Sequence, residues 1–344
     1  MTDPFSETQV KIAVIGGGTG SFTLLSALKD HTTQLAALVN MADDGGSTGM
    51  LRDELGALPP GDVRQCLVAL SRTPEIRDLF NYRFDEGSLK GHAFGNLFLT
   101  ALEKMTGDFG RGVELASEVL NIVGVVEPIT QTNVTLAMRS QNGEETLGEF
   151  EITEKDFAGE KPEFWLTPDA IPSPRALRAI ELADIVVIAP GNLYGSLAPA
   201  LIVPGIGEAL EKSNAFKVYV CNLVTKPGQT DGYDVSEFAQ EIERLAGRKF
   251  LNAVIYNTEK PSDELLKKYA KEGELSVEYD KAKLETAPYI AAGSQLVANE
   301  IWQNSNRSDP IGVARTLIRH DSAAVATAII EIHDYYRASK KVKH

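Results

Sequence analysis

A short apolar strand that runs into a glycine-rich turn constrains this chain more than any other feature. The apolar run Ile12–Ile15 is followed by Gly16-Gly17-Gly18-Thr19-Gly20-Ser21 and then by a helix-like segment, Phe22–Leu28. Glycine allows backbone angles and close approaches that a Cβ would block. A helix N-terminus presents unpaired N–H groups and a partial positive charge. The run therefore predicts a cradle for a phosphate or another anion.

The spacing of the loop argues against two familiar nucleotide motifs. A Walker A loop requires a lysine, and this loop has none. A Gly-x-Gly-x-x-Gly dinucleotide loop would need glycine at Ser21 and an acid after the second strand, which ends at Asn40. One alternative stays open besides phosphate binding: the glycines serve only a tight strand–helix turn.

Further apolar runs predict a Rossmann-like fold. Four of them resemble buried parallel strands, and helical patterns separate most of them. Ser173-Pro174 marks a helix start that leads to Leu182, and Asp234 with Glu237 resembles a capping box. We expect a three-layer α/β/α fold with a mainly parallel sheet. The four runs are Leu35–Val39, Ile185–Ala189, Val218–Val220 and Ala253–Tyr256.

One segment departs from this alternation. From Val125 to Thr153 apolar and polar residues alternate around an Asn142-Gly143 turn, which predicts an added antiparallel β-hairpin. Asp156–Ala170 is interpreted as a connection, and Ser322–Ala338 as an amphipathic helix. We therefore expect one α/β domain over residues 10–322, with the hairpin near 125–153, and a C-terminal helix over 323–344 packed on it.

Composition limits the partners. The formal net charge of −14 argues against nucleic acid and anionic membrane surfaces, because phosphate backbones require basic surface. No apolar run approaches a membrane span of about 20 residues, and residues 1–9 lack a signal-peptide pattern. These features predict a cytoplasmic protein. Cys66 and Cys221 lack zinc-site spacing and are expected to be buried apolar residues.

A second polar segment, Asp43-Asp44-Gly45-Gly46-Ser47, follows the second strand. Ligands of open α/β sheets bind at the carboxyl ends of the strands. The two carboxylates could ligate Mg²⁺ or accept hydrogen bonds from ribose hydroxyls. The alternative is a solvated Asp-Gly turn.

Other segments carry polar side chains near predicted helix starts. Asp62 is a candidate helix cap, whereas Arg64 opposes the helix dipole, which suggests pairing with a ligand phosphate or with Asp62. Asn96 is another candidate cap, and His92 is expected to be structural. Gly191-Asn192-Leu193 forms a second strand–glycine–helix cradle, and Asn222 and Thr225 follow the next strand.

Together these segments resemble the gluconeogenesis factor (YvcK-like) family, within the superfamily of CofD, the 2-phospho-L-lactate transferase. The matching motifs span residues 11–322 in order. They are Gly16–Gly20, Asp43–Gly49 with Leu51-Arg52, Pro59–Arg64, His92–Leu97, Pro190–Tyr194, Asn222 with Pro227–Tyr233, and Arg319-His320-Asp321.

The resemblance implies a bacterial cytoplasmic protein that binds UDP-sugars, such as UDP-N-acetylglucosamine. It also implies a role in cell-wall synthesis and cell shape on gluconeogenic carbon sources. We expect a ligand-binding regulator, with homo-oligomers and cell-wall regulatory proteins as partners and no cofactor other than Mg²⁺. The alternative is an Mg²⁺-dependent phospholactyl or nucleotidyl transferase of the CofD type.

In the predicted site, backbone amides of Gly17–Ser21 and Gly191–Leu193 hold a diphosphate or nucleoside, and arginines supply charge. No catalytic residue is predicted. Arg319 is assigned to the ligand, with a surface pair to Asp321 as the alternative, and Ser322 is a candidate phosphorylation site that intact-mass analysis would test. The predicted ligand-binding residues are Gly17, Gly18, Thr19, Gly20, Ser21, Asp43, Asp44, Ser47, Arg52, Asp62, Arg64, Asn96, Gly191, Asn192, Leu193, Asn222, Thr225 and Arg319.

Overall fold

A seven-stranded parallel sheet forms the middle layer of the computed structural model, which describes residues 9–262, 266–267, 270–271, 273–298 and 319–341. The strand order is β10-β9-β8-β7-β1-β2-β3, and each ladder between these strands is parallel. The strands are β1 (Ile12–Gly16), β2 (Leu35–Val39), β3 (Val125–Pro128), β7 (Ile185–Ile188), β8 (Phe216–Val220), β9 (Ala253–Asn257) and β10 (Ile290–Ser294).

The order of the strands reverses between β1 and β7. The chain passes outward from β1 to β2 and β3, and then returns to β7 on the other side of β1 before it continues to β8, β9 and β10. Such a reversal opens a crevice at the carboxyl ends of the two central strands, where open α/β sheets bind their ligands. The loops after β1 and β7 therefore diverge from one point.

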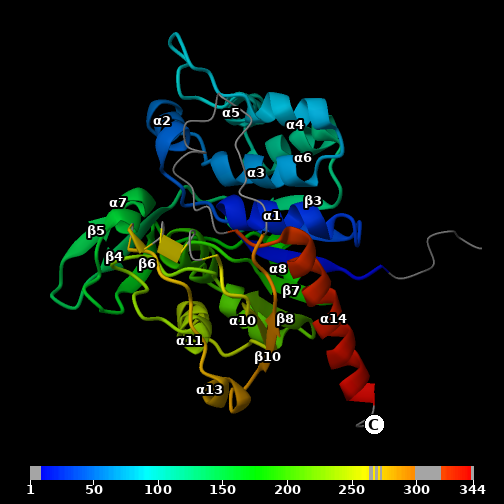
Figure 1. The fold of residues 1–344 in the computed structure, drawn as a ribbon. Helices are drawn as coiled ribbons and strands as arrows, with labels where there is room; N and C mark the ends of the chain where they lie inside the picture. The colour runs from blue at the N-terminus through cyan, green and yellow to red at the C-terminus, as the bar shows by residue number, and fades with distance from the viewer. Residues whose placement is uncertain (1–8, 263–265, 268–269, 272, 299–318, 342–344) are drawn as a thin grey trace, which may run out of the picture.

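Helices cover both faces of the sheet (Figure 1). Side chains of β1 alternate between two cores: Ile12 and Val14 face one, and Ala13 and Ile15 face the other. The first face carries α1 (Gly18–Leu28), α3 (Gly61–Leu70) and α14 (Ser322–Lys341), with α2 (Gly46–Leu55), α4 (Pro74–Asn81), α5 (Phe94–Thr106) and α6 (Phe109–Leu120) on the same side. The second carries α8 (Pro174–Leu182), the π-helix η1 (Leu193–Leu197), α9 (Ala198–Leu201), α10 (Ile206–Lys212) and α11 (Val235–Ala246).

A small antiparallel sheet with the order β5-β4-β6 lies beside the main one. The hairpin prediction is correct for β4 (Thr135–Arg139) and β5 (Glu145–Leu147) only. The start of that segment is instead β3, which pairs in parallel with β2, and its end is helix α7 (Glu149–Glu154). Alternation indicates an extended strand but does not say which strand is its partner.

The predicted connection Asp156–Ala170 is also corrected by the structure. It contains β6 (Glu163–Thr167), which pairs with β4 along its whole length. Leu166 of β6 is buried in the core, and Phe164 stacks on Tyr194. The Pro, Glu and Lys residues around it concealed these apolar contacts in the sequence.

Helix starts follow the sequence closely. The Ser173 hydroxyl accepts a hydrogen bond from the Ala176 N–H, and Asp234 and Glu237 form the expected capping box. Asp321 caps α14 by accepting from the Ala324 N–H at 3.0 Å. Val325 and Ile329 of α14 are buried against the first core, and both cysteines are buried thiols.

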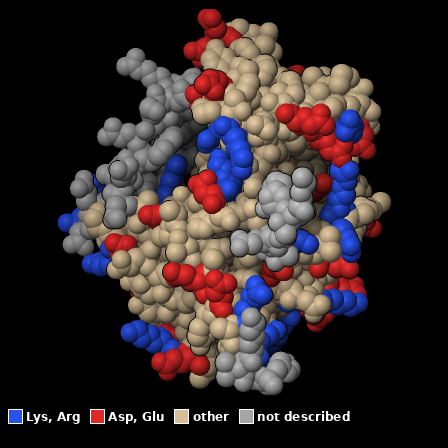
Figure 2. Space-filling model, turned by 90° about the vertical axis from the view of Figure 1, so that its right-hand side faces the viewer, with Lys and Arg blue, Asp and Glu red and all other residues tan. Residues whose placement is uncertain are grey.

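No single helix in the described ranges is long and apolar enough to span a membrane, although the bent pair Leu193–Leu201 and Ile206–Lys212 reaches that length and composition. Figure 2 shows that Lys and Arg side chains on one face of the molecule are scattered among Asp and Glu.

A buried carboxylate joins α11 to the π-helix. Glu241 is fully buried. Its carboxylate accepts hydrogen bonds from Nε and Nη2 of Arg244 and, at 3.0 Å, from the Tyr194 hydroxyl. Tyr194 lies in η1, directly after the loop that follows β7. This bonding fixes the position of that loop against the second helical layer.

We expect Glu241→Ala to lower the free energy of unfolding by about 3 kcal/mol, because it removes the buried carboxylate that pairs with Arg244 and accepts from the Tyr194 hydroxyl. Urea denaturation measures this change. Glu208→Ala is the matched control, since Glu208 pairs with Lys212 on the exposed surface of α10 and should matter little. Equal effects of the two substitutions would contradict the assignment.

Candidate functional site

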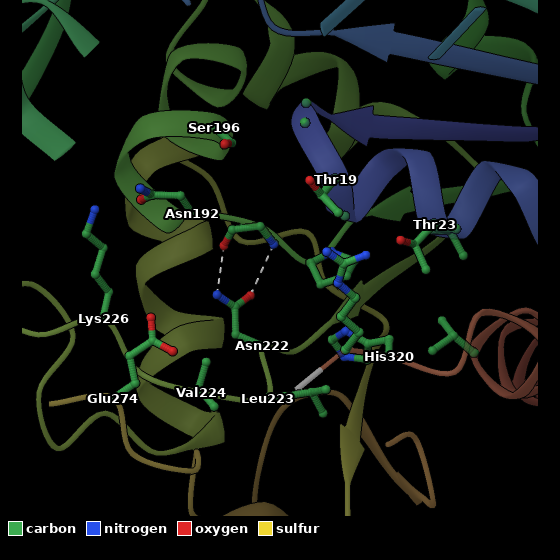
Figure 3. Close-up of a pocket in the computed structure, with 18 of the residues that line it drawn as sticks. Thr19, Thr23, Asn192, Ser196, Asn222, Leu223, Val224, Lys226, Glu274 and His320 are labelled. Atoms are coloured by element: carbon green, nitrogen blue, oxygen red, sulfur yellow. Dashed lines mark hydrogen bonds between the residues drawn. The ribbon is translucent and has the colours of Figure 1, made fainter. Parts of the chain in front are cut away.

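A pocket of about 510 Å³ opens where the sheet reverses, and we call it the glycine pocket. The start of α1, the loops after β7 and β8, and the start of α14 surround it (Figure 3). Its lining residues are Gly17, Gly18, Thr19, Gly20, Thr23, Leu24, Gln65, Pro190, Gly191, Asn192, Ser196, Asn222, Leu223, Val224, Thr225, Lys226, Pro227, Glu274, Arg319, His320, Ser322 and Val325.

Two contacts fix the backbone of this pocket. A Cβ on Gly20 would overlap the carbonyl oxygen of Pro190, so only glycine lets the loops after β1 and β7 approach this closely. The Asn222 side chain binds Gly191 twice: Nδ2 donates to the carbonyl oxygen at 2.7 Å, and Oδ1 accepts from the N–H at 3.3 Å (Figure 3). The loops after β1, β7 and β8 are thereby held together.

The glycine pocket presents backbone donors to a ligand. Helix α1 starts at Gly18, earlier than the Phe22 of the helix-like segment in the sequence, so the glycines form its first turn. The N-cap residue Gly17 has no side chain to cap this N-terminus, and no acidic residue lies in the first turn. The Asp62 carboxylate, from α3, accepts a hydrogen bond from the Gly18 N–H. The Asn192 side chain, by contrast, caps η1 by accepting from the N–H groups of Tyr194 and Gly195. The other amide groups of the first turn of α1, and its partial positive charge, are therefore suited to an anion.

Side chains from the far end of the chain complete this pocket. Lys226 follows β8, and burial lowers the pKa of its ammonium. Arg319 lies in the segment just before α14, and Ser322 is the first residue of that helix. His320 is partly buried, desolvation lowers its pKa to about 4, and its Nε2–H donates to the Cys221 carbonyl at 3.1 Å. A neutral histidine thus joins the segment that carries Arg319 to the end of β8.

A second pocket, of about 280 Å³, adjoins the first, and we call it the acidic pocket. Gln65 and Ser196 line both pockets. The other lining residues of the acidic pocket are Asn40, Asp43, Gly45, Gly46, Ser47, Thr48, Gly61, Asp62, Arg64, Arg83, Asn96, Glu149, Phe150 and Gly195.

Three carboxylates share the acidic pocket: Asp62 is buried, and Asp43 and Glu149 are partly buried. Burial, then the charges of Asp43 and Glu149, raise the pKa of Asp62 to about 8. Burial and Asp43 raise the pKa of Glu149 to about 7, and burial also raises the pKa of Asp43. A Cβ on Gly17 would overlap Asp62, and one on Gly195 would overlap Glu149. The glycines thus make room for the carboxylates.

The predicted capping roles of Asp62 and Asn96 are wrong. Pro60 is the N-cap of α3 and Ala93 that of α5, and neither helix has a side-chain cap. The Asn96 amide instead accepts from Arg64 Nε at 3.0 Å and donates to the Ser47 hydroxyl at 3.2 Å.

The same network accounts for two further residues. His92 Nδ1 lies 3.1 Å from the Ser47 hydroxyl, and Arg64 Nη1 donates to Asn81 at 2.6 Å. Both residues are buried. The network holds one wall of the acidic pocket rigid.

The structure places most of the predicted ligand-binding residues in one of the two pockets. Gly17, Gly18, Thr19, Gly20, Gly191, Asn192, Asn222, Thr225 and Arg319 line the glycine pocket. Asp43, Ser47, Asp62, Arg64 and Asn96 line the acidic pocket.

Four of the predicted residues, Ser21, Asp44, Arg52 and Leu193, line neither pocket. Ser21 and Leu193 are buried in the fold. Asp44 accepts hydrogen bonds from the N–H groups of Glu149 and Phe150, at the start of α7. Arg52 donates to the carbonyl oxygens of Asp43 and Val134 and to the Asn133 side chain.

Thr23, Gln65, Glu149 and Glu274 line the pockets but were not predicted. Glu149 follows the β4–β5 hairpin, and nothing in its local sequence shows that the hairpin returns to the sheet edge. Thr23 and Gln65 lie one turn inside helices α1 and α3, whereas the sequence motifs that predict the site are glycine-rich and polar loops.

The carboxylates do not form a metal site by themselves. Among the described residues, no group of three His, Cys, Asp or Glu side chains is arranged to hold a metal ion. Both oxygens of Asp44 bind backbone N–H groups, so Asp43 is left as the carboxylate that could face Mg²⁺. Mg²⁺ is often held by one or two carboxylates together with substrate phosphates, so its presence stays a prediction.

The raised pKa of Asp62 gives a pH dependence with a defined sign. The pKa of Asp62 is higher in the folded chain than in the unfolded chain, so the protonated carboxyl favours the folded state. This contribution to the free energy of unfolding is complete at low pH and is lost as the pH rises through about 8. We expect the urea midpoint of the wild type to fall between about pH 5 and pH 8.5, and that of Asp62→Asn to fall less. Asp78→Asn, at an exposed position on α4, should follow the wild type. If the urea midpoint fell with pH by the same amount in all three proteins, Asp62 would not be the group that causes the pH dependence.

Comparisons with known proteins agree with this fold. A family model described as 2-phospho-L-lactate transferase CofD matches residues 12–297. A putative gluconeogenesis factor of Thermotoga maritima is 41% identical over 325 residues, covering 94% of this chain and 99% of that protein. The gluconeogenesis factor of Bacillus subtilis is 38% identical over 325 residues, covering 94% and 98%.

A solved structure gives the same result. The crystal structure of a UPF0052 family member from Bacillus halodurans matches with a TM-score of 0.84 at 39% identity, covering 94% of this chain and 99% of that one. Because the family model matches residues 12–297 and relatives 38–41% identical align over almost their whole length, this chain belongs to the gluconeogenesis factor family, within the group described by the CofD model.

Proposed function

We propose that this protein is a regulatory protein that binds a nucleotide sugar, specifically a UDP-sugar, across the two adjoining pockets. The observation that carries the proposal is the pairing of an amide-rich pocket with a carboxylate-rich pocket through the shared residues Gln65 and Ser196. A nucleotide sugar has the matching halves: an anionic diphosphate and a neutral sugar that carries hydroxyl groups.

The glycine pocket supports the diphosphate half. Amides in the first turn of α1, together with Lys226 and Arg319, are suited to phosphate oxygens. The nucleoside has the remaining space along Leu223, Val224 and Thr225 after β8.

The acidic pocket supports the sugar half. Burial, and then the charges of neighbouring carboxylates, raise the pKa of Asp62 and of Glu149, even with Arg64 in the wall. A further anion would add to that repulsion, whereas sugar hydroxyls can donate hydrogen bonds to carboxylates. This favours a neutral group beyond the diphosphate.

The names of the relatives support the biological setting. The relative in Bacillus subtilis carries the name gluconeogenesis factor, and the one in Thermotoga maritima carries the name putative gluconeogenesis factor. We propose that this chain acts in the cytoplasm and supports cell-wall synthesis and cell shape during gluconeogenic growth. Homo-oligomers, cell-wall regulatory partners and phosphorylation of Ser322, which lines the glycine pocket, remain predictions.

The second candidate is an Mg²⁺-dependent phospholactyl or nucleotidyl transferase. The match to the CofD model over residues 12–297 favours it, together with the position of Asp43 in the acidic pocket. Such transfer needs little beyond positioning and charge stabilisation by the metal. The transferase requires an anionic donor group in the acidic pocket, whereas the regulator requires a neutral one.

Thermal unfolding in the presence of candidate ligands separates the two. A ligand at 100 times its dissociation constant stabilises the folded state by about 2.7 kcal/mol. We expect a rise in Tm with UDP-glucose or UDP-N-acetylglucosamine, and none with NAD. No rise with any UDP compound would exclude the leading proposal. A rise with GDP or GTP plus Mg²⁺, and turnover of an added phospholactyl donor, would favour the transferase.

Arg319→Ala tests the contribution of the C-terminal segment. We expect the substitution to weaken UDP-sugar binding by at least tenfold, because it removes a positive charge from the phosphate side of the glycine pocket. Calorimetric titration measures the affinity. Arg337→Ala, at an exposed position of α14, is the control and should bind like the wild type. Unchanged affinity of Arg319→Ala would remove this arginine from the site but would not overturn UDP-sugar binding.

A further inference from the structure

The short helix α7 follows the small antiparallel sheet and supplies two side chains to the acidic pocket. Glu149 and Phe150, the first two residues of the helix, both line that pocket. A helix of six residues is not stable by itself, so contacts with the rest of the fold must set its position. The position of α7 therefore decides where these two side chains lie in the pocket.

Side chains from two loops of the main sheet hold the two ends of α7. Asp44, which follows β2, accepts from the N–H groups of Glu149 and Phe150 at 3.0 and 2.9 Å. Gln229, which follows β8, is buried, and its Nε2 donates to three carbonyl oxygens around the end of α7 at 2.8–3.2 Å. The N–H and C=O groups at the ends of a helix need such partners. These contacts fix α7 between the loops after β2 and β8.

The Glu149 carboxylate is oriented by hydrogen bonding from its own helix. Thr153, one turn later, donates from its hydroxyl to Glu149 Oε1 at 3.0 Å. The same hydroxyl accepts from Asn192 Nδ2 at 3.4 Å, and Asn192 lines the glycine pocket (Figure 3). Gly195 of η1 leaves the space that this carboxylate occupies. Two hydrogen bonds thus join Glu149 to the wall of the neighbouring pocket.

Phe150 gives the acidic pocket an apolar surface next to this carboxylate. It lines the pocket and is 54% exposed, so its ring has room for a further contact. A sugar carries hydroxyl groups around its ring and C–H groups on the faces of the ring. A carboxylate can bond the hydroxyls, and an aromatic ring can pack against the C–H groups. Glu149 and Phe150 therefore offer both kinds of contact that a sugar can make.

Stability of the fold explains the anchors of α7 but not the two side chains in the pocket. The need to satisfy the ends of a helix accounts for Asp44 and Gln229. It does not require a carboxylate at Glu149, where burial and the charge of Asp43 disfavour the ionised form. Single exposed apolar residues are common on protein surfaces, but Phe150 borders a pocket beside that carboxylate.

We propose that α7 recognises the sugar: Glu149 bonds a sugar hydroxyl, Phe150 packs on a face of the sugar ring, and Thr153 is a positioning residue that orients Glu149. This inference rests on the proposed function. Because the diphosphate and the nucleoside are assigned to the glycine pocket, α7 adds to the affinity only when a sugar is attached. A change in α7 should therefore alter the preference for UDP-glucose over UDP and leave the affinity for UDP as it is.

Thr153→Val tests the positioning role through calorimetric titration of the full chain with UDP-glucose and, separately, with UDP. We expect about tenfold weaker binding of UDP-glucose, because Glu149 Oε1 loses its donor, and an unchanged affinity for UDP. Thr153→Ser keeps a hydroxyl and should restore the preference for UDP-glucose. Thr167→Val makes the same change at an exposed position of β6 and should change neither affinity.

Phe150→Ala tests the aromatic contact in the same titrations. We expect weaker binding of UDP-glucose and unchanged binding of UDP, because the substitution removes a surface that only the sugar meets. Leu147→Ala is the matched control: Leu147 lies three residues earlier, is 57% exposed and lines neither pocket. The unchanged affinity for UDP also shows that each variant is folded.

The titrations separate this inference from the proposed function. Sugar recognition by α7 is overturned, and UDP-sugar binding is not, if the wild type binds UDP-glucose and UDP equally well. The same holds if either Thr153→Val or Phe150→Ala keeps the wild-type preference or weakens both ligands by the same factor. If the wild type binds neither ligand, the proposed function fails and this inference fails with it.

Discussion

The contact between Gly20 and the Pro190 carbonyl is the constraint on which the rest of the site depends. It lies where the strand order reverses, so the loops after β1 and β7 leave the sheet side by side and must pass very close to each other. A side chain on Gly20 would separate them and open the floor of the glycine pocket. Asn222 then fixes the β7 loop from the next strand, and Glu241 fixes the π-helix behind it.

The acidic pocket shows the opposite kind of constraint. Asp43, Asp62 and Glu149 are held together although burial and mutual repulsion disfavour their charged forms. Stability alone does not require such an arrangement, because apolar residues would fill the same volume at lower cost. Strongly shifted pKa values in a cleft are typical of functional sites. The tension among these carboxylates is therefore a physical reason to assign the pocket to a ligand.

Sequence reasoning succeeded where a local pattern has one physical meaning. The central strands, the capping box at Asp234 and the N-cap at Ser173 follow from hydrophobic runs and capping chemistry within a few residues. It failed where the meaning depends on a distant partner. Val125–Pro128 looks like part of a hairpin but pairs with β2, and Asp62 looks like a cap but faces Gly17. Glu149 was missed for the same reason, since its neighbours in the acidic pocket are about a hundred residues away in the sequence.

The sequence by itself determined the fold class, the family and the loops that border the site, because glycine density, strand periodicity and motif order are local properties of the chain. Only the tertiary structure decided which side chains face the ligand space. It showed that Asp44 and Arg52 bond to backbone groups and that Ser21 and Leu193 are buried outside both pockets, whereas Gln65, Glu149 and Ser196 line the pockets. The physical reason is that the direction of a side chain is set by packing between segments far apart in the sequence. The glycine loop after β1 is one wall of a two-part cleft whose other walls come from β2, β7, β8, α7 and α14.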